Sequence, residues 1–211
     1  MYADSEKKIG AALGSVRDKV IIATKTLKRD AEGTAAHIAR SLDNLQTDYL
    51  DLFQFHNIAT DEELKQVLAP DGAMKAVREA MAVGKIKHIG FSSHNIDTAV
   101  RVCQTGLFST IQFPFNFIEK EPLDELFQVA REFDMGIIAM KPLGGGLLES
   151  AALCFKYLQQ YPDIVPIPGI STREELDEIL ALYESPQSLS QVDKDEIERI
   201  RTDLGKDFCH R

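Results

Sequence analysis

Leu50-Asp-Leu-Phe-Gln-Phe-His56 is a short apolar run that ends in an imidazole. Four of its first six residues are Leu or Phe, a density that is typical of a strand covered on both faces. Strands of this kind occur in parallel sheets, because helices cover both sides of such sheets. The stretch therefore predicts a buried strand over Leu50–Phe55, with His56 at its carboxyl end.

An earlier stretch, Val20-Ile-Ile-Ala-Thr-Lys25, has the same design, with Lys25 at its carboxyl end. Two buried strands that each carry an ionisable side chain at the same end indicate a parallel sheet whose reactive side chains lie together on one rim. In barrel-type α/β enzymes that rim carries the active site. We therefore expect Lys25 and His56 to meet at one edge of the sheet.

Strand and helix patterns alternate along the chain, which indicates βαβ units and a parallel sheet. A doubly wound dinucleotide fold would show G-x-G-x-x-G after its first strand, and this motif is absent. The prediction is an α/β fold of the (β/α)8 TIM-barrel type with six βα units present. The expected strands are Val20–Thr24, Leu50–Phe55, Lys87–Phe91, Thr110–Phe113, Gly136–Met140 and Ile164–Ile167.

Local signals place several helices between these strands. The spacing of apolar residues predicts a helix over Ser5–Val16. The Gly-rich turn Leu143–Gly146 is expected to lead into a helix through Tyr161. Thr60-Asp-Glu-Glu63 and Ser171-Thr-Arg-Glu174 have the pattern of a capping box at the start of a helix.

Composition limits the classes of partner. The 211 residues are 44% hydrophobic and carry a formal charge of −9, which argues against a nucleic-acid-binding surface. No apolar run approaches the roughly 20 residues needed to span a bilayer, and no cleavable leader is recognisable, so no membrane partner and a cytoplasmic location are expected. The three cysteines are too few and too widely spaced for a disulfide framework, and Cys103 and Cys154 lie in apolar, helical surroundings that predict core positions.

Several short motifs, taken together, resemble the aldo-keto reductases. That family carries D-T-A-x-x-Y-G-x-S-E-x-x-(L/I)-G, then a strand that ends in T-K and a strand that ends in H. Six matches occur in the family's order over nearly all of residues 1–185. They are Tyr2 with Ser5, Glu6 and Gly10; Thr24-Lys25; His56; Gly90-Phe-Ser92 with Gln112; Lys141-Pro-Leu-Gly-Gly145; and Ile167-Pro-Gly169.

The resemblance implies hydride transfer between a nicotinamide and the carbonyl of a small aldehyde or ketone. Tyr2 is then the general acid, although a phenol ordinarily titrates near pH 10. Lys25 corresponds to the ammonium that lowers the pKa of this phenol, and His56 to the group that donates to the carbonyl oxygen and orients it. Without the motif, each has an ordinary interpretation: a terminal tyrosine, a lysine at a strand end and a loop histidine.

The same resemblance implies where the cofactor binds. Ser92 and Gln112 match the positions that hold the nicotinamide carboxamide, and Leu143, Gly144 and Gly145 match the segment along the pyrophosphate. Gly169, Ser171 and Arg173 match the adenosine-phosphate end. Arg173 is the only cation near that end and is surrounded by carboxylates, so NADP is favoured on family grounds and NAD stays open.

The resemblance also bears on the extent of the chain. The family barrel has eight strands and its Tyr follows the second, so the first two strands are expected upstream of this sequence, as a continuation of the parent reading frame. Residues 1–211 are then a single incomplete barrel domain, with a C-terminal helix and tail over 186–211. The ending Phe208-Cys-His-Arg211 resembles the entrance to a Cys-rich segment, so a 4Fe–4S cluster is expected only if the parent chain continues.

Three alternatives remain open at this stage. The chain is an active oxidoreductase, a nicotinamide-binding or regulatory module without turnover, or a fragment without a function of its own. Neither the substrate nor the oligomeric state follows from the sequence. Phe53, Phe115 and Phe117 are either the apolar lining of a substrate pocket or core residues.

Overall fold

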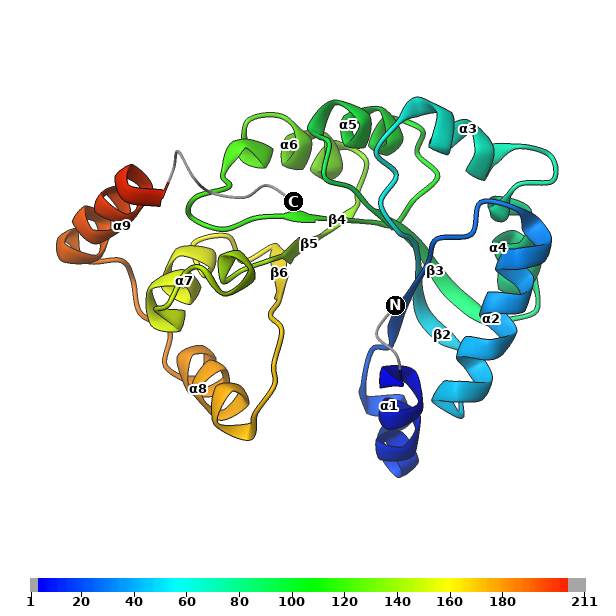
Figure 1. Ribbon diagram of the computed structural model, residues 1–211, viewed down its shortest axis with the longest axis horizontal. Helices are drawn as coiled ribbons and strands as arrows, with labels where there is room; N and C mark the ends of the chain where they lie inside the picture. The colour runs from blue at the N-terminus through cyan, green and yellow to red at the C-terminus, as the bar shows by residue number, and fades with distance from the viewer. Residues whose placement is uncertain (1–3, 205–211) are drawn as a thin grey trace. The chain divides into compact units, whose positions relative to one another are not determined.

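The computed structural model describes residues 4–204. In this part of the chain helices alternate with six strands, whose order along one sheet, β1-β2-β3-β4-β5-β6, is that of the sequence (Figure 1). The chain forms two compact units. The N-terminal unit ends at Thr110 and the C-terminal unit begins at Ile111.

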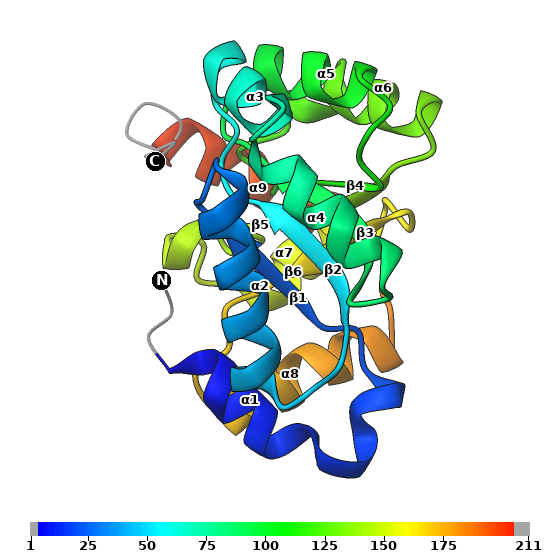
Figure 2. The ribbon, with the colours of Figure 1, turned by 90° about the vertical axis from the view of Figure 1, so that its right-hand side faces the viewer.

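The N-terminal unit contains three complete strands and their helices. β1, β2 and β3 pair in parallel, with Lys25 opposite Gln54 and Gln54 opposite Gly90. α2 packs against β1 and α4 against β3, and the two helices lie side by side (Figure 2). The elements of this unit are α1 (Ser5–Leu13), η1 (Gly14–Lys19), β1 (Ala23–Thr26), α2 (Ala31–Leu45), β2 (Leu50–Phe55), α3 (Asp61–Leu68), α4 (Ala73–Ala82), β3 (Ile86–Ser92) and α5 (Ile96–Gln104).

The aromatic side chains of β2 belong to the core between the strands and the helices. Phe53 contacts His37 of α2 edge to face at 6.3 Å between ring centroids, and Phe55 contacts Phe108 at 6.1 Å. Phe91 of β3 completes the cluster at 5.1 Å from Phe108. Because successive side chains of a strand point to opposite faces, Lys25 and Gln54 lie on the face turned away from α2.

The C-terminal unit follows the same plan. β5 and β6 pair in parallel, and Phe115 packs against the rings of Phe127, Tyr157 and Tyr161. Phe115 is therefore a core residue, as Phe53 is in the N-terminal unit. The elements of this unit are β4 (Thr110–Pro114, whose first residue closes the N-terminal unit), η2 (Glu121–Leu123), α6 (Leu126–Glu132), β5 (Gly136–Met140), η3 (Gly144–Gly146), α7 (Ala151–Leu158), β6 (Ile164–Ile167), α8 (Arg173–Glu184) and α9 (Gln191–Leu204).

The first expected helix and strand needed correction. α1 ends at Leu13, because Gly14 adopts a φ of 37° and a 3-10 turn follows. β1 begins at Ala23 rather than Val20, and the side chain of Ile21 is 83% exposed. The physical cause is at Ile22, whose N–H donates to the Asp51 carboxylate at 3.0 Å instead of to a strand backbone.

The predicted core cysteines are confirmed. Cys103 and Cys154 are free thiols and are buried. Burial disfavours the charged thiolate, and it raises the pKa of each thiol to about 12. Both side chains therefore act as small apolar core residues rather than as nucleophiles. Cys209 lies outside the described residues.

Candidate active site

Tyr2 lies outside the described residues, but the helix that follows it is firmly anchored. Glu6, in the first turn of α1, accepts hydrogen bonds from the hydroxyls of Thr24 and Ser41, both at 2.8 Å, and from the Asn44 amide at 3.1 Å. Burial raises the pKa of Glu6, but the three donors outweigh that effect and hold the pKa below its usual range. The carboxylate thus ties α1 to both β1 and α2.

Glu6 is expected to make stability depend on pH. Because its folded pKa lies below the usual value of 4.5, the ionised carboxylate stabilises the fold above that value, and this contribution is lost as the pH falls through the folded pKa. In urea unfolding, the free-energy gap between wild type and Glu6→Gln should be constant from about pH 5.5 to pH 7 and shrink below about pH 4.5.

The control for this measurement is Glu79→Gln, since Glu79 is an exposed carboxylate of α4. It should follow the wild type at every pH. A gap between wild type and Glu6→Gln that stays the same from pH 7 to pH 3 would contradict the prediction.

Lys25 is the third residue of β1 and is half-buried. Removal from water disfavours the ammonium, so burial lowers the pKa of Lys25. On either side of it, Thr24 and Thr26 direct their hydroxyls to Glu6 and His37. Lys25 therefore presents its ammonium on the opposite face, next to Gln54 of β2 in the strand register.

His56 directly follows β2, where the sequence predicts it. Its N–H donates to the Thr26 carbonyl at 2.9 Å, and its Nδ1 is buried with no hydrogen-bond partner among the described residues. Burial lowers the pKa of His56, and the positive charges of Lys25 and Arg29 lower it further. The structure thus brings Lys25 and His56 within electrostatic reach of one another, and it keeps the imidazole neutral near pH 7.

Arg29 is a residue of this site that sequence reasoning missed. Its Nη2 donates to the carbonyls of His56 at 2.7 Å and Asn57 at 3.2 Å, and it lies 3.5 Å from the Glu63 carboxylate. The guanidinium thereby fixes the backbone on which the imidazole sits. No sequence signal identifies it, because Lys28 and Arg29 look alike as exposed charges in a loop.

Ser92 is the last residue of β3 and supports the same turn. Its hydroxyl accepts from the N–H of Asn57 at 2.9 Å, and its carbonyl accepts from Ile58 at 2.8 Å. Asn57 adopts a left-handed φ of 53°, which this contact stabilises. A hydroxyl accepts and donates at once, so Ser92 retains a proton that it can offer to a ligand amide.

Two groups of predicted cofactor residues of the C-terminal unit lie within β4 and after β5. Gln112 is buried in β4, and its amide donates to the Met140 sulfur of β5 at 3.3 Å. Gly144, Gly145 and Gly146 have φ values of 57°, 69° and 96°. No atom lies within 4 Å of a Cβ built on Gly145 or Gly146, so the turn offers bare, accessible backbone.

The helix expected after this turn is present but shorter than predicted. α7 spans Ala151–Leu158, and Ser150 caps it by accepting from Leu153 at 3.2 Å. A helix thus follows the glycine turn as predicted, but it ends at Leu158 rather than at Tyr161. Within the turn, the N–H groups of Gly144 and Gly146 donate to the carbonyls of Lys141 and Leu143, both at 2.9 Å.

Asn116 was also missed, and it holds this turn in place. Its Nδ2 donates to the Lys141 carbonyl at 3.1 Å and to the Glu119 carboxylate at 2.9 Å. Its Oδ1 accepts from the N–H groups of Ile118 and Glu119. Lys141 has a φ of 55°, so the clamp stabilises a strained residue three positions before Gly144.

The last predicted cofactor residues lie at the start of α8. The capping box is one residue later than expected: Thr172 is the N-cap, and its partner is Glu175 rather than Glu174. Ser171 precedes the cap. The Arg173 side chain is 86% exposed, and its Nε lies 3.6 Å from an Asp177 carboxylate oxygen. Gly169 is exposed, and a Cβ added to it would have no atom within 4 Å.

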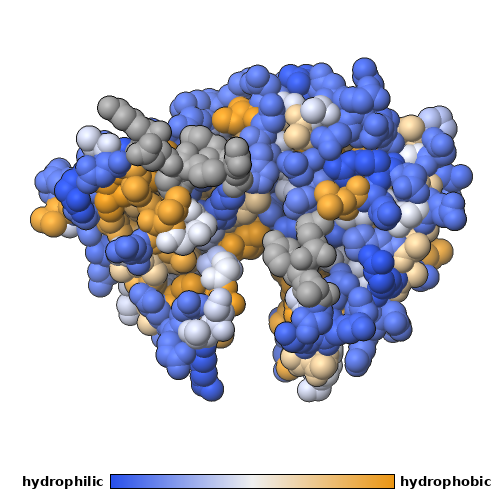
Figure 3. All heavy atoms as spheres, in the orientation of Figure 1, coloured by the Kyte–Doolittle hydropathy of each residue, from blue (hydrophilic) through white to orange (hydrophobic). Residues whose placement is uncertain are grey.

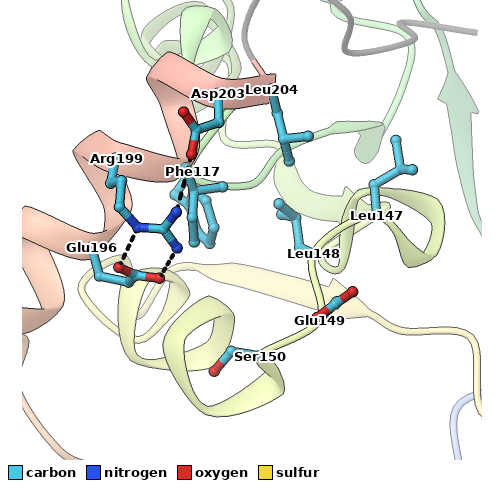
Figure 4. A pocket seen from close by; sticks show the side chains of 10 residues that line it. Phe117, Leu147, Leu148, Glu149, Ser150, Glu196, Arg199, Asp203 and Leu204 are labelled. Atoms are coloured by element: carbon cyan, nitrogen blue, oxygen red, sulfur yellow. Dashed lines mark hydrogen bonds and ion pairs between the residues drawn. The ribbon is translucent and has the colours of Figure 1, made fainter.

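A pocket of about 310 Å³ lies between α9 and the segment before α7 (Figure 4). Arg199 of α9 stands at its rim, held by Glu196 at 2.6 Å and Asp203 at 3.0 Å. Phe117 is buried and lines this pocket, whereas Phe53 and Phe115 do not. The apolar wall is completed by Leu147, Leu148, Ile200 and Leu204, and apolar side chains gather beside α9 in Figure 3.

Two further properties concern residues 4–204. No helix in that range is both long and apolar enough to cross a membrane. No group of three or more His, Cys, Asp or Glu side chains in the same range is arranged to hold a metal ion.

The comparisons with known proteins agree with this geometry. A sequence profile of the aldo/keto reductase family matches residues 1–153. Aldo-keto reductase YhdN of Bacillus subtilis (strain 168) is 30% identical over 162 residues, which are 70% of this chain and 46% of the relative. The uncharacterized oxidoreductase YrpG of the same organism is 28% identical over 160 residues, 66% of this chain and 47% of the relative. The chain thus spans about half the length of these curated relatives.

Solved structures show the same fold. The apo form of aldo-keto reductase AKR11C1 from Bacillus halodurans superposes with a TM-score of 0.76 at 19% identity, over 92% of this chain and 76% of that one. An aldo/keto reductase from Klebsiella pneumoniae in complex with NADP and acetate superposes with a TM-score of 0.76 at 22% identity. The match covers 95% of this chain and 77% of that one. The prediction of an α/β fold with six βα units of the barrel type is confirmed. On the evidence of the profile match, the chain belongs to the aldo/keto reductase family.

Proposed function

We propose that the chain acts as a nicotinamide-dependent oxidoreductase that reduces an aldehyde or ketone by hydride transfer. The observation that carries the proposal is the placement of Lys25 and His56 toward the carboxyl ends of the adjacent strands β1 and β2, where burial lowers the pKa of both and the charge of Lys25 acts on His56. Perturbed titratable groups held together in this way are typical of active sites. Family membership and the NADP-bound relative from Klebsiella pneumoniae point to the same chemistry.

The nicotinamide supplies the hydride when bound. The chain has to supply a proton and stabilise the charge that develops on the carbonyl oxygen. Tyr2 is the proposed proton donor, and the Lys25 ammonium favours its phenolate form after the proton has left. His56, kept neutral by burial and by its cationic neighbours, donates a hydrogen bond to the oxygen and orients it.

Each unit contains residues that could bind part of a nicotinamide cofactor. Ser92 can offer its hydroxyl proton to the carboxamide, and Gln112 of β4 is the second proposed partner of that group. The exposed backbone at Gly145 and Gly146, where a Cβ would have no atom within 4 Å, leaves room for a pyrophosphate to approach closely. These contacts would bind and orient the cofactor.

Carbonyl-dependent oxidation of NADH and NADPH by the full chain tests the proposal, with a panel of aldehydes and ketones. We expect turnover with at least one cofactor, and loss of turnover in Tyr2→Phe with cofactor binding retained. Cofactor binding without turnover in the wild type would favour a regulatory module instead. Binding of neither cofactor would overturn the proposal.

A further inference from the structure

The start of α8 is the place where the cofactor's adenosine phosphate would lie under the proposed function. N–H groups at the start of a helix attract anions, and barrels often hold phosphate after their last strands. In this chain two N–H groups immediately before the first turn of α8, those of Ser171 and Thr172, have a partner already. One carboxylate oxygen of Glu175, Oε2, accepts from the N–H of Ser171 at 2.6 Å and from the N–H of Thr172 at 3.2 Å.

The surrounding charges are also unfavourable to a phosphate. Arg173 provides a guanidinium, but its side chain is 86% exposed and lies beside Asp177. Glu174, Glu175 and Glu178 follow within the first two turns of α8. This end of the C-terminal unit is hydrophilic in Figure 3. The first two turns of α8 thus carry four carboxylates and one guanidinium, and one of the four, Asp177, lies beside that guanidinium.

NADH and NADPH differ at this place in one group only. NADPH carries a 2′-phosphate with a charge of about −1.5 to −2 near neutral pH, whereas NADH carries a neutral hydroxyl there. The phosphate would need donors that Glu175 occupies, and it would be repelled by the carboxylates. The ribose hydroxyl of NADH can instead donate to a carboxylate.

We infer that the chain prefers NADH to NADPH, with Glu175 as the residue that closes the start of α8 to the 2′-phosphate. The inference rests on the proposed function, and it departs from the expectation of NADP that the family resemblance favours. Glu175 acts in two ways: it occupies the N–H groups of Ser171 and Thr172, and it places a negative charge where the phosphate would be. The rest of the cofactor is unaffected, because the glycine turn and Ser92 do not contact that group.

The test measures the dissociation constants of the full chain for NADH and NADPH, by the change in nicotinamide fluorescence, at low and high salt. At low ionic strength NADH should bind about tenfold more tightly or better. Salt screens repulsion between exposed charges, with a Debye length of about 30 Å at 0.01 M and about 8 Å at 0.15 M. The NADPH-to-NADH ratio of dissociation constants should therefore fall toward one as salt is added.

The substitution Glu175→Gln tests the effect of the negative charge separately from the effect of the helix cap. A glutamine at this position can still accept from the helix-start N–H groups, so the capping box is retained while the negative charge is removed. The NADPH-to-NADH ratio of dissociation constants should fall several-fold, with little change in melting temperature. Glu184→Gln, the same substitution at the last residue of α8, is the matched control and should leave the ratio unchanged.

The outcomes are distinguishable. Tighter binding of NADPH by the wild type, or an unchanged ratio in Glu175→Gln, would overturn this inference while the proposed function stands. A ratio that rises with salt would also overturn it, because attraction by Arg173 would then dominate. Binding of neither cofactor would overturn the proposed function and this inference together.

Discussion

Replacing Lys25 by Met is expected to lower kcat for carbonyl reduction by about 10²–10⁴-fold, the range found when a proton-transfer group is disabled. Met has nearly the shape of Lys but no charge, so the Tyr2 phenolate loses the ammonium that favours it. The dissociation constant of the cofactor should stay near the wild-type value. In the pH–rate profile, the limb that reflects ionisation of the Tyr2 phenol should move to higher pH.

A loss of folding does not explain this result. Burial lowers the pKa of Lys25, which means that keeping the ammonium charged costs the folded protein free energy. Lys25→Met removes that cost, so its melting temperature should equal or exceed that of the wild type. Lys28→Met, at an exposed position three residues on, is the control and should keep full activity. A Lys25→Met variant with wild-type kcat would refute the assigned role.

Gly10→Ala is expected to destabilise the fold by about 1–3 kcal/mol, the usual effect of an added carbon in a closely packed contact. A Cβ at Gly10 would lie 2.4 Å from the Asn44 carbonyl oxygen and 2.7 Å from the Leu45 carbonyl carbon. These are backbone atoms of α2, so relief requires α1 to move away from α2. That movement would also strain the hydrogen bonds of Glu6.

Thermal unfolding checks this prediction, with Gly33→Ala in α2 as the matched control. A Cβ at Gly33 would meet only the side chains of Asp30 and Lys28, which can move aside. Because Ala favours a helix over Gly by up to about 1 kcal/mol, Gly33→Ala should be neutral or stabilising. If Gly10→Ala melted at the same temperature as Gly33→Ala, the close approach of α1 and α2 would not have the importance argued above.

The strands that sequence reasoning located best are short, mostly apolar runs with polar or turn residues beside them. β2, β5 and β6 begin and end at the predicted residues, although only β2 is buried along nearly its whole length. The first strand was misplaced at its start. Val20 and Ile21 have the composition of a strand, but the N–H of Ile22 donates to the Asp51 side chain, which the local sequence does not reveal.

The start of α8 is a second feature that the local sequence does not fix. Ser171–Glu174 and Thr172–Glu175 are both S/T-x-x-E patterns, so the sequence leaves two candidate capping boxes in overlapping positions. The structure selects the second, because Thr172 has the extended backbone of an N-cap. This one-residue difference decides which carboxylate occupies the N–H groups, and so which residue is expected to govern cofactor choice.

By itself, the sequence determined the alternation of strands and helices, the family, and the positions of Lys25 and His56, because these depend on local composition and on the order of motifs. Only the tertiary structure decided that Arg29 fixes the backbone of His56, that Asn116 clamps Lys141, and that Glu175 faces the N–H groups before α8. Those contacts depend on which polar atoms burial brings together, and the pattern of residue types along a chain does not encode the pairing of one donor with one acceptor.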